Sequence, residues 1–157
     1  RYTAVEGILE LREAICDKFR RDNQIEYQPD QVLVSNGAKQ SLCNLCMALL
    51  GPGDEAIVPA PYWVSYPDMV KLADARPAIL SATPENDYKI TPRELQNTLN
   101  ENTRLLILNS PSNPTGSVYP REELEALADE AGFDDVEEFA AMLLRRANFT
   151  DSRYHPN

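Results

Sequence analysis

The chain has 157 residues, of which 43% are hydrophobic and 25% are charged. These proportions are typical of a soluble globular protein, and the length allows one domain with a buried core. The net charge of −10 argues against nucleic acid and anionic membranes as partners. The longest apolar stretch, residues 42–50, is too short to span a bilayer, so we predict no membrane segment.

The chain contains three cysteines, Cys16, Cys43 and Cys46, and an odd number does not form a disulfide framework. No basic-then-apolar segment opens the sequence, so we expect no export signal and predict a cytoplasmic location. The spacing of Cys43 and Cys46 is compatible with half a metal site or a redox pair. Because no second pair accompanies them, we predict no metal site and interpret them as small buried residues on one helix.

The first half of the chain predicts two helices and a strand. Residues 8–21 carry apolar side chains at helical spacing with charges between them, which indicates an amphipathic helix. Residues 31–35 are short, apolar and β-branched, which favours a buried strand. A turn at Asn36-Gly37 then leads into an apolar helix over residues 38–50, and glycines and a proline in residues 51–54 end it.

The following elements alternate between strand and helix. We predict strands at residues 55–59, 77–81 and 104–109, and helices at residues 64–73, from Thr91 and from Tyr119. Thr91 is followed by proline and, three residues on, by Glu94, which is the pattern of a capping box. Short strands alternating with helices indicate parallel pairing through crossovers. The predicted fold class is therefore α/β, a three-layer α/β/α sandwich with a mainly parallel sheet and a helical C-terminal tail.

The first of three unusual loops follows the predicted strand at residues 31–35. Ligands collect at the carboxyl ends of strands in open α/β sheets. Here Gly37, Ala38 and Lys39 open a helix, and the free backbone amides of a helix N-terminus can hold a phosphate. The alternative is an ordinary strand-to-helix joint that contains glycine.

Two further loops present polar or aromatic groups in restricted geometry. Trp63 follows two prolines and can stack on a flat heteroaromatic ring, unless it is simply a core residue. Asn113 lies among Pro111, Pro114 and Gly116, and its amide can both donate and accept hydrogen bonds. We expect an X-Pro bond in this loop to be cis. The alternative for this loop is a rigid turn with capping duties.

The order and spacing of GAK, PYW and SNPTG resemble those of the class I/II, fold-type-I aminotransferases that depend on pyridoxal phosphate. The segment PGDEAIVPAPYWVSYPDMV looks most like the bacterial aspartate or prephenate aminotransferase subgroup. The resemblance runs from Tyr2 to about Ala128. We therefore expect a partial large domain at residues 1–128 and a family-divergent, acidic helical tail at residues 129–157.

The resemblance implies that the backbone amides of Gly37, Ala38 and Lys39 hold the phosphate of pyridoxal 5′-phosphate. The tyrosine that matches Tyr2 reaches the phosphate bound by a neighbouring subunit. This implies a homodimer with a shared site. We also predict self-association through an exposed sheet edge and apolar face, unless the acidic tail covers that face.

The resemblance also implies that Trp63 stacks on the pyridine ring of the cofactor. Asn113 then bonds the phenolic oxygen, and both side chains help to place the substrate, an amino acid or a 2-oxo acid. The bond between Asn113 and Pro114 is commonly cis in such proteins.

The family also uses a lysine that holds the cofactor as a Schiff base, an aspartate beside the pyridine nitrogen and an arginine that binds the substrate carboxylate. All three are expected after the Asn113 loop, and none is visible there. The chain's four lysines are Lys18, Lys39, Lys71 and Lys89. We therefore name no catalytic residue.

From this absence we expect a fragment of an aspartate aminotransferase-like enzyme that is inactive alone. Residues 129–157 depart from the family and resemble a substituted end. The alternatives are a non-catalytic cofactor-binding or scaffold fragment, and a related carbon–sulfur lyase or aminocyclopropane-carboxylate synthase.

Overall fold

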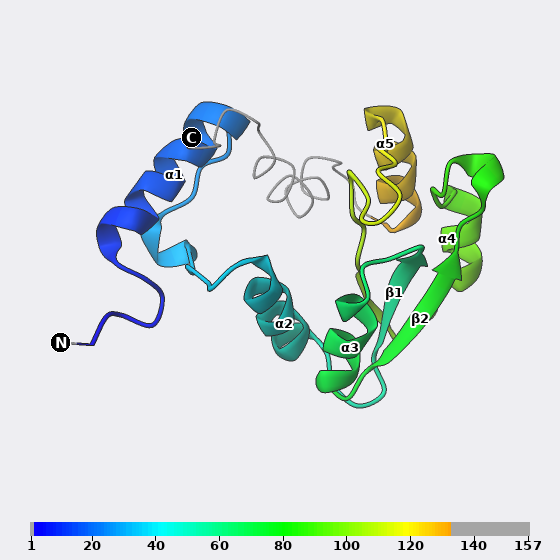
Figure 1. Cartoon of the computed structure of the whole chain (residues 1–157), viewed down its shortest axis with the longest axis horizontal. Helices are drawn as coiled ribbons and strands as arrows, with labels where there is room; N and C mark the ends of the chain where they lie inside the picture. The colour runs from blue at the N-terminus through cyan, green and yellow to red at the C-terminus, as the bar shows by residue number, and fades with distance from the viewer. Residues whose placement is uncertain (1, 133–157) are drawn as a thin grey trace. The chain divides into compact units, whose positions relative to one another are not determined.

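The computed structural model describes residues 2–132, so all of the predicted tail except residues 129–132 lies outside the described part of the chain. The chain divides into two compact units, with the boundary after Leu45, inside α2 (Figure 1). The first unit contains two of the predicted helices, close to their expected bounds. Its elements are α1 (Leu9–Asn23), the 3₁₀ turn η1 (Pro29–Gln31) and the first part of α2 (Ala38–Leu49).

The predicted strand at residues 31–35 is wrong. Val32 is extended (φ −111°, ψ 123°), but no strand is formed between residues 2 and 45 of the first unit. The backbone amide of Val34 donates instead to the carbonyl of Glu6 at 3.0 Å. A β-branched run prefers extended dihedrals, but a strand needs a ladder of hydrogen bonds to a neighbour, and the sheet belongs to the second unit.

The second unit is built on a three-stranded parallel sheet with the order β2-β1-β3. The strands are β1 (Glu55–Ala60), β2 (Arg76–Ser81) and β3 (Thr103–Leu106), and they confirm the three strands predicted for this part of the chain. The third ends earlier than expected, although the amide of Ile107 still donates to the carbonyl of Ile57 at 3.0 Å. The α/β fold class is thereby confirmed for this unit.

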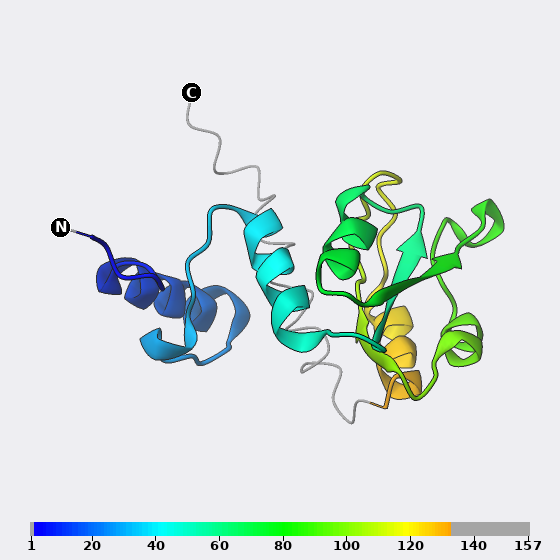
Figure 2. The ribbon, with the colours of Figure 1, turned by 90° about the horizontal axis from the view of Figure 1, so that it is seen from below.

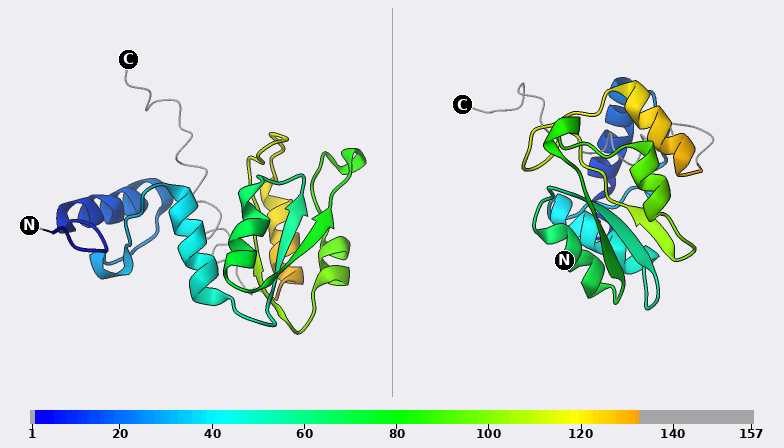
Figure 3. Two further views of the ribbon diagram at one scale, coloured as in Figure 1. Left: turned by 60° about the horizontal axis from the view of Figure 1, so that its bottom comes forward. Right: turned by 90° about the vertical axis from the view of Figure 1, so that its right-hand side faces the viewer.

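The strand order determines on which face of the sheet the helices of this unit lie. They are α3 (Ser65–Leu72), α4 (Pro92–Thr98) and α5 (Arg121–Glu130), and the 3₁₀ turn η2 (Pro84–Asn86) precedes α4. The chain moves from β1 outward to β2, and then back across β1 to β3. Because both crossovers are right-handed, opposite directions of travel place α3 and α4 on opposite faces of the sheet. Figures 2 and 3 show α3 on one face and α4 with α5 on the other.

The central strand β1 is buried on both faces, and Ala56, Ile57 and Val58 have no exposed surface. Ile57 packs in one cluster with Leu95 of α4 and Leu127 of α5, both also fully buried. Burying a leucine or isoleucine side chain stabilises a protein by about 1.5–3 kcal/mol. These contacts therefore hold the two helices on the sheet more firmly than surface ion pairs can.

The predicted start of α4 is confirmed in detail. The backbone amide of Glu94 donates to Oγ1 of Thr91 at 3.3 Å, and the amide of Thr91 donates to Oε2 of Glu94 at 2.8 Å. This reciprocal pair satisfies two backbone donors that would otherwise lack partners. Within residues 2–132, no helix is long and apolar enough to cross a membrane.

Candidate functional site

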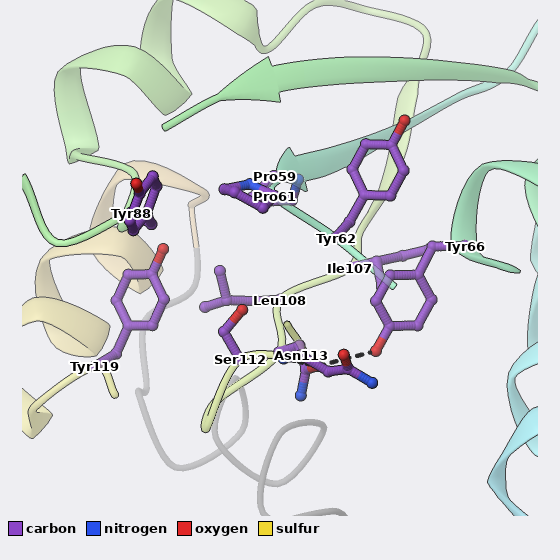
Figure 4. A pocket seen from close by; sticks show the side chains of 11 residues that line it. Pro59, Pro61, Tyr62, Tyr66, Tyr88, Ile107, Leu108, Ser112, Asn113 and Tyr119 are labelled. Atoms are coloured by element: carbon purple, nitrogen blue, oxygen red, sulfur yellow. Dashed lines mark hydrogen bonds between the residues drawn. The ribbon is translucent and has the colours of Figure 1, made fainter. Parts of the chain in front are cut away.

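A crevice opens at the carboxyl ends of β1 and β3. The two strands are neighbours, but the chain leaves β1 toward α3 on one face and β3 toward α5 on the other. Such a point, where the connections diverge, is where open α/β sheets bind ligands. A cavity of about 20 Å³ lies between these loops, and Tyr62, Tyr66 and Asn113 are among its lining residues (Figure 4). This volume holds about one water molecule, so a larger ligand would lie on the open side of the crevice.

The loop that carries Asn113 is fixed by its own hydrogen bonds. The amide of Ser112 donates to the carbonyl of Ser117 at 2.9 Å, and the amide of Gly116 donates back to the carbonyl of Ser112 at 2.8 Å. The bond between Asn113 and Pro114 is cis, as predicted, and two further X-Pro bonds of this unit are cis as well. Asn113 itself is exposed at the tip of this closed turn.

The side chain of Asn109 stabilises the same loop through two hydrogen bonds. Its Oδ1 accepts a hydrogen bond from the backbone amide of Asn113 at 3.0 Å, and its Nδ2 donates to the carbonyl of Pro111 at 2.9 Å. Sequence reasoning missed this residue. The sequence shows only that Asn109 follows the apolar run of residues 105–108. A solvent-exposed loop side chain is the simplest interpretation of a carboxamide at that position.

Trp63 is half-buried just before α3. Its ring meets that of Tyr66 edge to face, with centroids 5.5 Å apart and planes at 87°, which is a favourable aromatic geometry. Tyr66 is only 1% exposed, and its hydroxyl donates to Oδ1 of Asn109 at 3.2 Å (Figure 4, dashed line). Tyr66 and Asn109, which the sequence analysis did not predict as site residues, thus link Trp63 to Asn113. Trp63 and Asn113 are the two residues that it did predict.

The predicted phosphate cradle lies in the first unit, at the start of α2. Gly37 has φ +81°, a backbone conformation that favours glycine, and a Cβ at this position would have no atom within 4 Å. Ala38 and Lys39 follow as the first residues of the helix, and all three are exposed. The amide of Gly37 donates to the carbonyl of Ser35 at 2.8 Å. The helix end is therefore open to an anion, although the Gly37 amide already has a protein acceptor.

A polar hollow of about 250 Å³ lies beside this helix end. It is lined by residues of the first unit: Thr3, Ala4, Val5, Gly7, Val34, Ser35, Asn36 and Gln40. The side chain of Gln40 accepts a hydrogen bond from the amide of Asn36 at 2.6 Å and shapes the turn. Tyr2 belongs to the same unit and its side chain is fully exposed. Trp63 and Asn113 belong to the second unit.

Tyr119 supports the crevice from the side of α5. Its backbone amide donates to Oγ of Ser110 at 3.1 Å, and its hydroxyl accepts from the amide of Ile90 at 2.8 Å. Burial raises the pKa of the Tyr119 phenol to about 12, and the carboxylates of Glu123 and Glu94 add to the rise. The phenol is therefore a neutral structural group at ordinary pH.

Cys43 and Cys46 both lie on α2, where Cys43 is half-buried and Cys46 is buried. Within residues 2–132 neither forms a disulfide. Across residues 2–132, no group of three or more His, Cys, Asp or Glu side chains is placed to hold a metal ion.

The second unit is a parallel α/β fold in which Trp63 and Asn113 lie in the loops that follow β1 and β3. Residues 1–133 match the family model of the aminotransferases of class I and II, and the chain belongs to this family. Members of the family depend on pyridoxal phosphate.

Three relatives illustrate the similarity. A bifunctional aspartate aminotransferase and glutamate/aspartate-prephenate aminotransferase of Petunia hybrida is 55% identical over 129 residues, which are 82% of this chain and 27% of the relative. The solved structure of Thermus thermophilus aspartate aminotransferase with maleate has a TM-score of 0.79 and 46% identity, over 84% of this chain and 35% of that one. Aromatic aminotransferase from Pyrococcus horikoshii has a TM-score of 0.78 and 38% identity, over 82% and 35%. The chain thus spans about a third of the length of these relatives.

Proposed function

We propose that this chain forms the cofactor-cradling part of an aminotransferase that uses pyridoxal phosphate and acts on an aspartate-like amino acid and a 2-oxo acid. The observation that carries the proposal is the chain of contacts through Tyr66 and Asn109 that links Trp63 to Asn113 beyond the ends of β1 and β3. An aromatic face and an exposed carboxamide beside it suit a flat, hydroxylated heteroaromatic ring.

Each predicted group has a distinct part in this proposal. Trp63 provides a face for the pyridine ring, held in place by the edge of Tyr66. Asn113 provides a donor for the phenolic oxygen, and its loop is closed before any ligand arrives. The N-terminus of α2, at Ala38 and Lys39, provides amides and a positive dipole end for the phosphate. When bound, pyridoxal phosphate supplies an electron-withdrawing ring next to the amino group of the substrate.

We further propose that the 157 residues bind the cofactor without turning substrate over. The family's covalent attachment requires a lysine beyond the Asn113 loop, and no lysine follows that loop in the sequence. The second candidate function, a non-catalytic cofactor-binding or scaffold protein, rests on the same observation. A homodimer in which Tyr2 reaches a neighbouring phosphate is part of the proposal, and the full exposure of Tyr2 supports it.

The chain's single tryptophan, Trp63, makes a direct binding experiment possible. Pyridoxal phosphate is titrated into the protein while tryptophan emission is recorded, and a saturable decrease that inorganic phosphate reverses is expected. Gly37→Ala should weaken this binding because it strains the backbone at φ +81°. Gly53→Ala is the matched control, since Gly53 has φ +94°, equally open surroundings and no part in the predicted site.

Borohydride treatment of the mixture distinguishes a chain that only binds the cofactor from a catalytic chain. Reduction followed by peptide mapping should give no uniquely labelled lysine if the chain only binds the cofactor. A stoichiometric label at one of the four lysines would support a catalytic chain instead. Emission that does not respond to pyridoxal phosphate at any concentration would leave the scaffold alternative and contradict the cofactor assignment.

A further inference from the structure

We propose that Asn109 is the positioning residue that fixes the Asn113 loop and couples it to Trp63. The inference rests on the proposed function, which assigns Asn113 and Trp63 to the cofactor and gives no part to Asn109. It starts from the fact that one carboxamide connects two segments of the second unit: the loop that carries Asn113, which it contacts at two points, and helix α3.

The geometry of the loop shows why this carboxamide matters. Asn113 lies four residues beyond Asn109, and its backbone amide donates to Oδ1 of Asn109 at 3.0 Å. The Nδ2 of the same side chain donates to the carbonyl of Pro111 at 2.9 Å. Both ends of the carboxamide are therefore used within one short loop, and the direction of the Asn113 backbone is set by it. An exposed side chain on a loop without such a restraint would sample many orientations.

The connection to α3 is long-range. The hydroxyl of Tyr66 donates to the same Oδ1 at 3.2 Å, across 43 positions of sequence. Tyr66 is buried, so its hydroxyl requires an acceptor, and its ring holds Trp63 edge to face. A single oxygen atom of Asn109 thus accepts from the residue that orients the stacking ring and from the residue that contacts the phenolic oxygen. The two predicted cofactor contacts are consequently held at one relative position.

The first test measures the loop in the complete 157-residue chain without any ligand. Asn109→Ala should accelerate hydrogen exchange of the Asn113 backbone amide about five- to tenfold, because the loss of one hydrogen bond removes its protection. Asn109→Asp retains the oxygen that accepts from Asn113 but loses the donor to the carbonyl of Pro111, so it should restore only part of the protection that Asn109→Ala removes. Asn97→Ala removes an exposed carboxamide on α4 and should leave the exchange unchanged.

The second test distinguishes positioning from general support of the fold. Pyridoxal phosphate and its analogue without the phenolic oxygen, 3-deoxypyridoxal phosphate, are titrated against Trp63 emission. Asn109→Ala should weaken binding of pyridoxal phosphate about tenfold and that of the analogue much less, since only the former has the oxygen that Asn113 contacts. Tyr66→Phe should alter the emission of Trp63 while leaving Asn113 exchange closer to the unsubstituted chain.

The outcomes separate the inference from the proposed function. Unchanged Asn113 exchange in Asn109→Ala overturns the inference, and so does an equal loss of affinity for cofactor and analogue. If the unsubstituted chain binds neither compound, the proposed function fails, and the exchange result still decides whether Asn109 fixes the loop.

Discussion

The hydroxyl of Tyr119 accepts a hydrogen bond from the backbone amide of Ile90 at 2.8 Å, and both residues are buried. This bond joins the segment before α4 to the segment before α5, 29 positions apart. It lies beside the core cluster in which both residues take part. A buried backbone donor is thus satisfied by a side chain from a distant part of the sequence.

Replacement of Tyr119 by phenylalanine should destabilise the chain by about 1–3 kcal/mol, because the amide of Ile90 is left buried without an acceptor. Urea denaturation followed by circular dichroism measures the change in the free energy of unfolding. Tyr88→Phe is a suitable control, since Tyr88 is 40% exposed and its hydroxyl can bond to water. Equal effects of the two substitutions would contradict the role given to the Tyr119 hydroxyl.

The raised pKa of the Tyr119 phenol predicts that the folded chain loses stability at alkaline pH. Burial raises the pKa of Tyr119 in the folded chain to about 12, above its ordinary value of 10.0. The folded state therefore keeps a proton that the unfolded state releases, so the stabilisation is fully present below pH 10 and is lost as the pH rises through 12. Tyrosinate absorbance should show one phenol that ionises later than the others, and Tyr119→Phe should remove this late component.

Leu95 tests the packing of α4 on the sheet. The side chain is fully buried in the cluster around Ile57, so Leu95→Ala should cost about 2–5 kcal/mol through lost burial and a residual cavity. Leu72→Ala on α3 is the matched control, because Leu72 is 65% exposed and should cost less than about 1 kcal/mol. A small effect at Leu95 would mean that α4 is not held by this cluster.

A substitution at Gly7 tests its close contact with Val34, which lies in the segment that was predicted as a strand. A Cβ on Gly7 would lie 2.7 Å from the side chain of Val34, and the residue has φ +100°. Gly7→Ala should therefore destabilise the first unit for two reasons, a steric clash and backbone strain of about 1 kcal/mol or more. Val34→Ala in the same chain should recover only part of the steric cost, because it removes the Cγ2 contact at 2.7 Å but leaves the Cβ of residue 34 at the same distance. Thermal melting of the single and double variants measures the loss and the partial recovery.

An unchanged melting temperature of Gly7→Ala would contradict both the close packing against Val34 and the backbone strain at φ +100°.

The sequence by itself determined the features that depend on near neighbours. The capping pair Thr91 and Glu94, the three strands of the sheet and the cis bond before Pro114 were all predicted and are all present. Each depends on the chemistry of a few consecutive residues, which local patterns record. The motifs around Trp63 and Asn113 also pointed to the family to which the chain belongs. The division at residues 128 and 129 stays a prediction.

The tertiary structure decided what depends on contacts between distant residues. Residues 31–35 have the composition of a strand, but Val34 bonds to Glu6 and not to a neighbouring strand. The sequence indicates only a loop residue at Asn109, but in the structure Tyr66, 43 positions away, donates a hydrogen bond to it. Side chains that are far apart in sequence meet only through the register of the strands and the packing of helices on them. The sequence could therefore predict Trp63 and Asn113 as ligand contacts, but it could not name the side chains that link them.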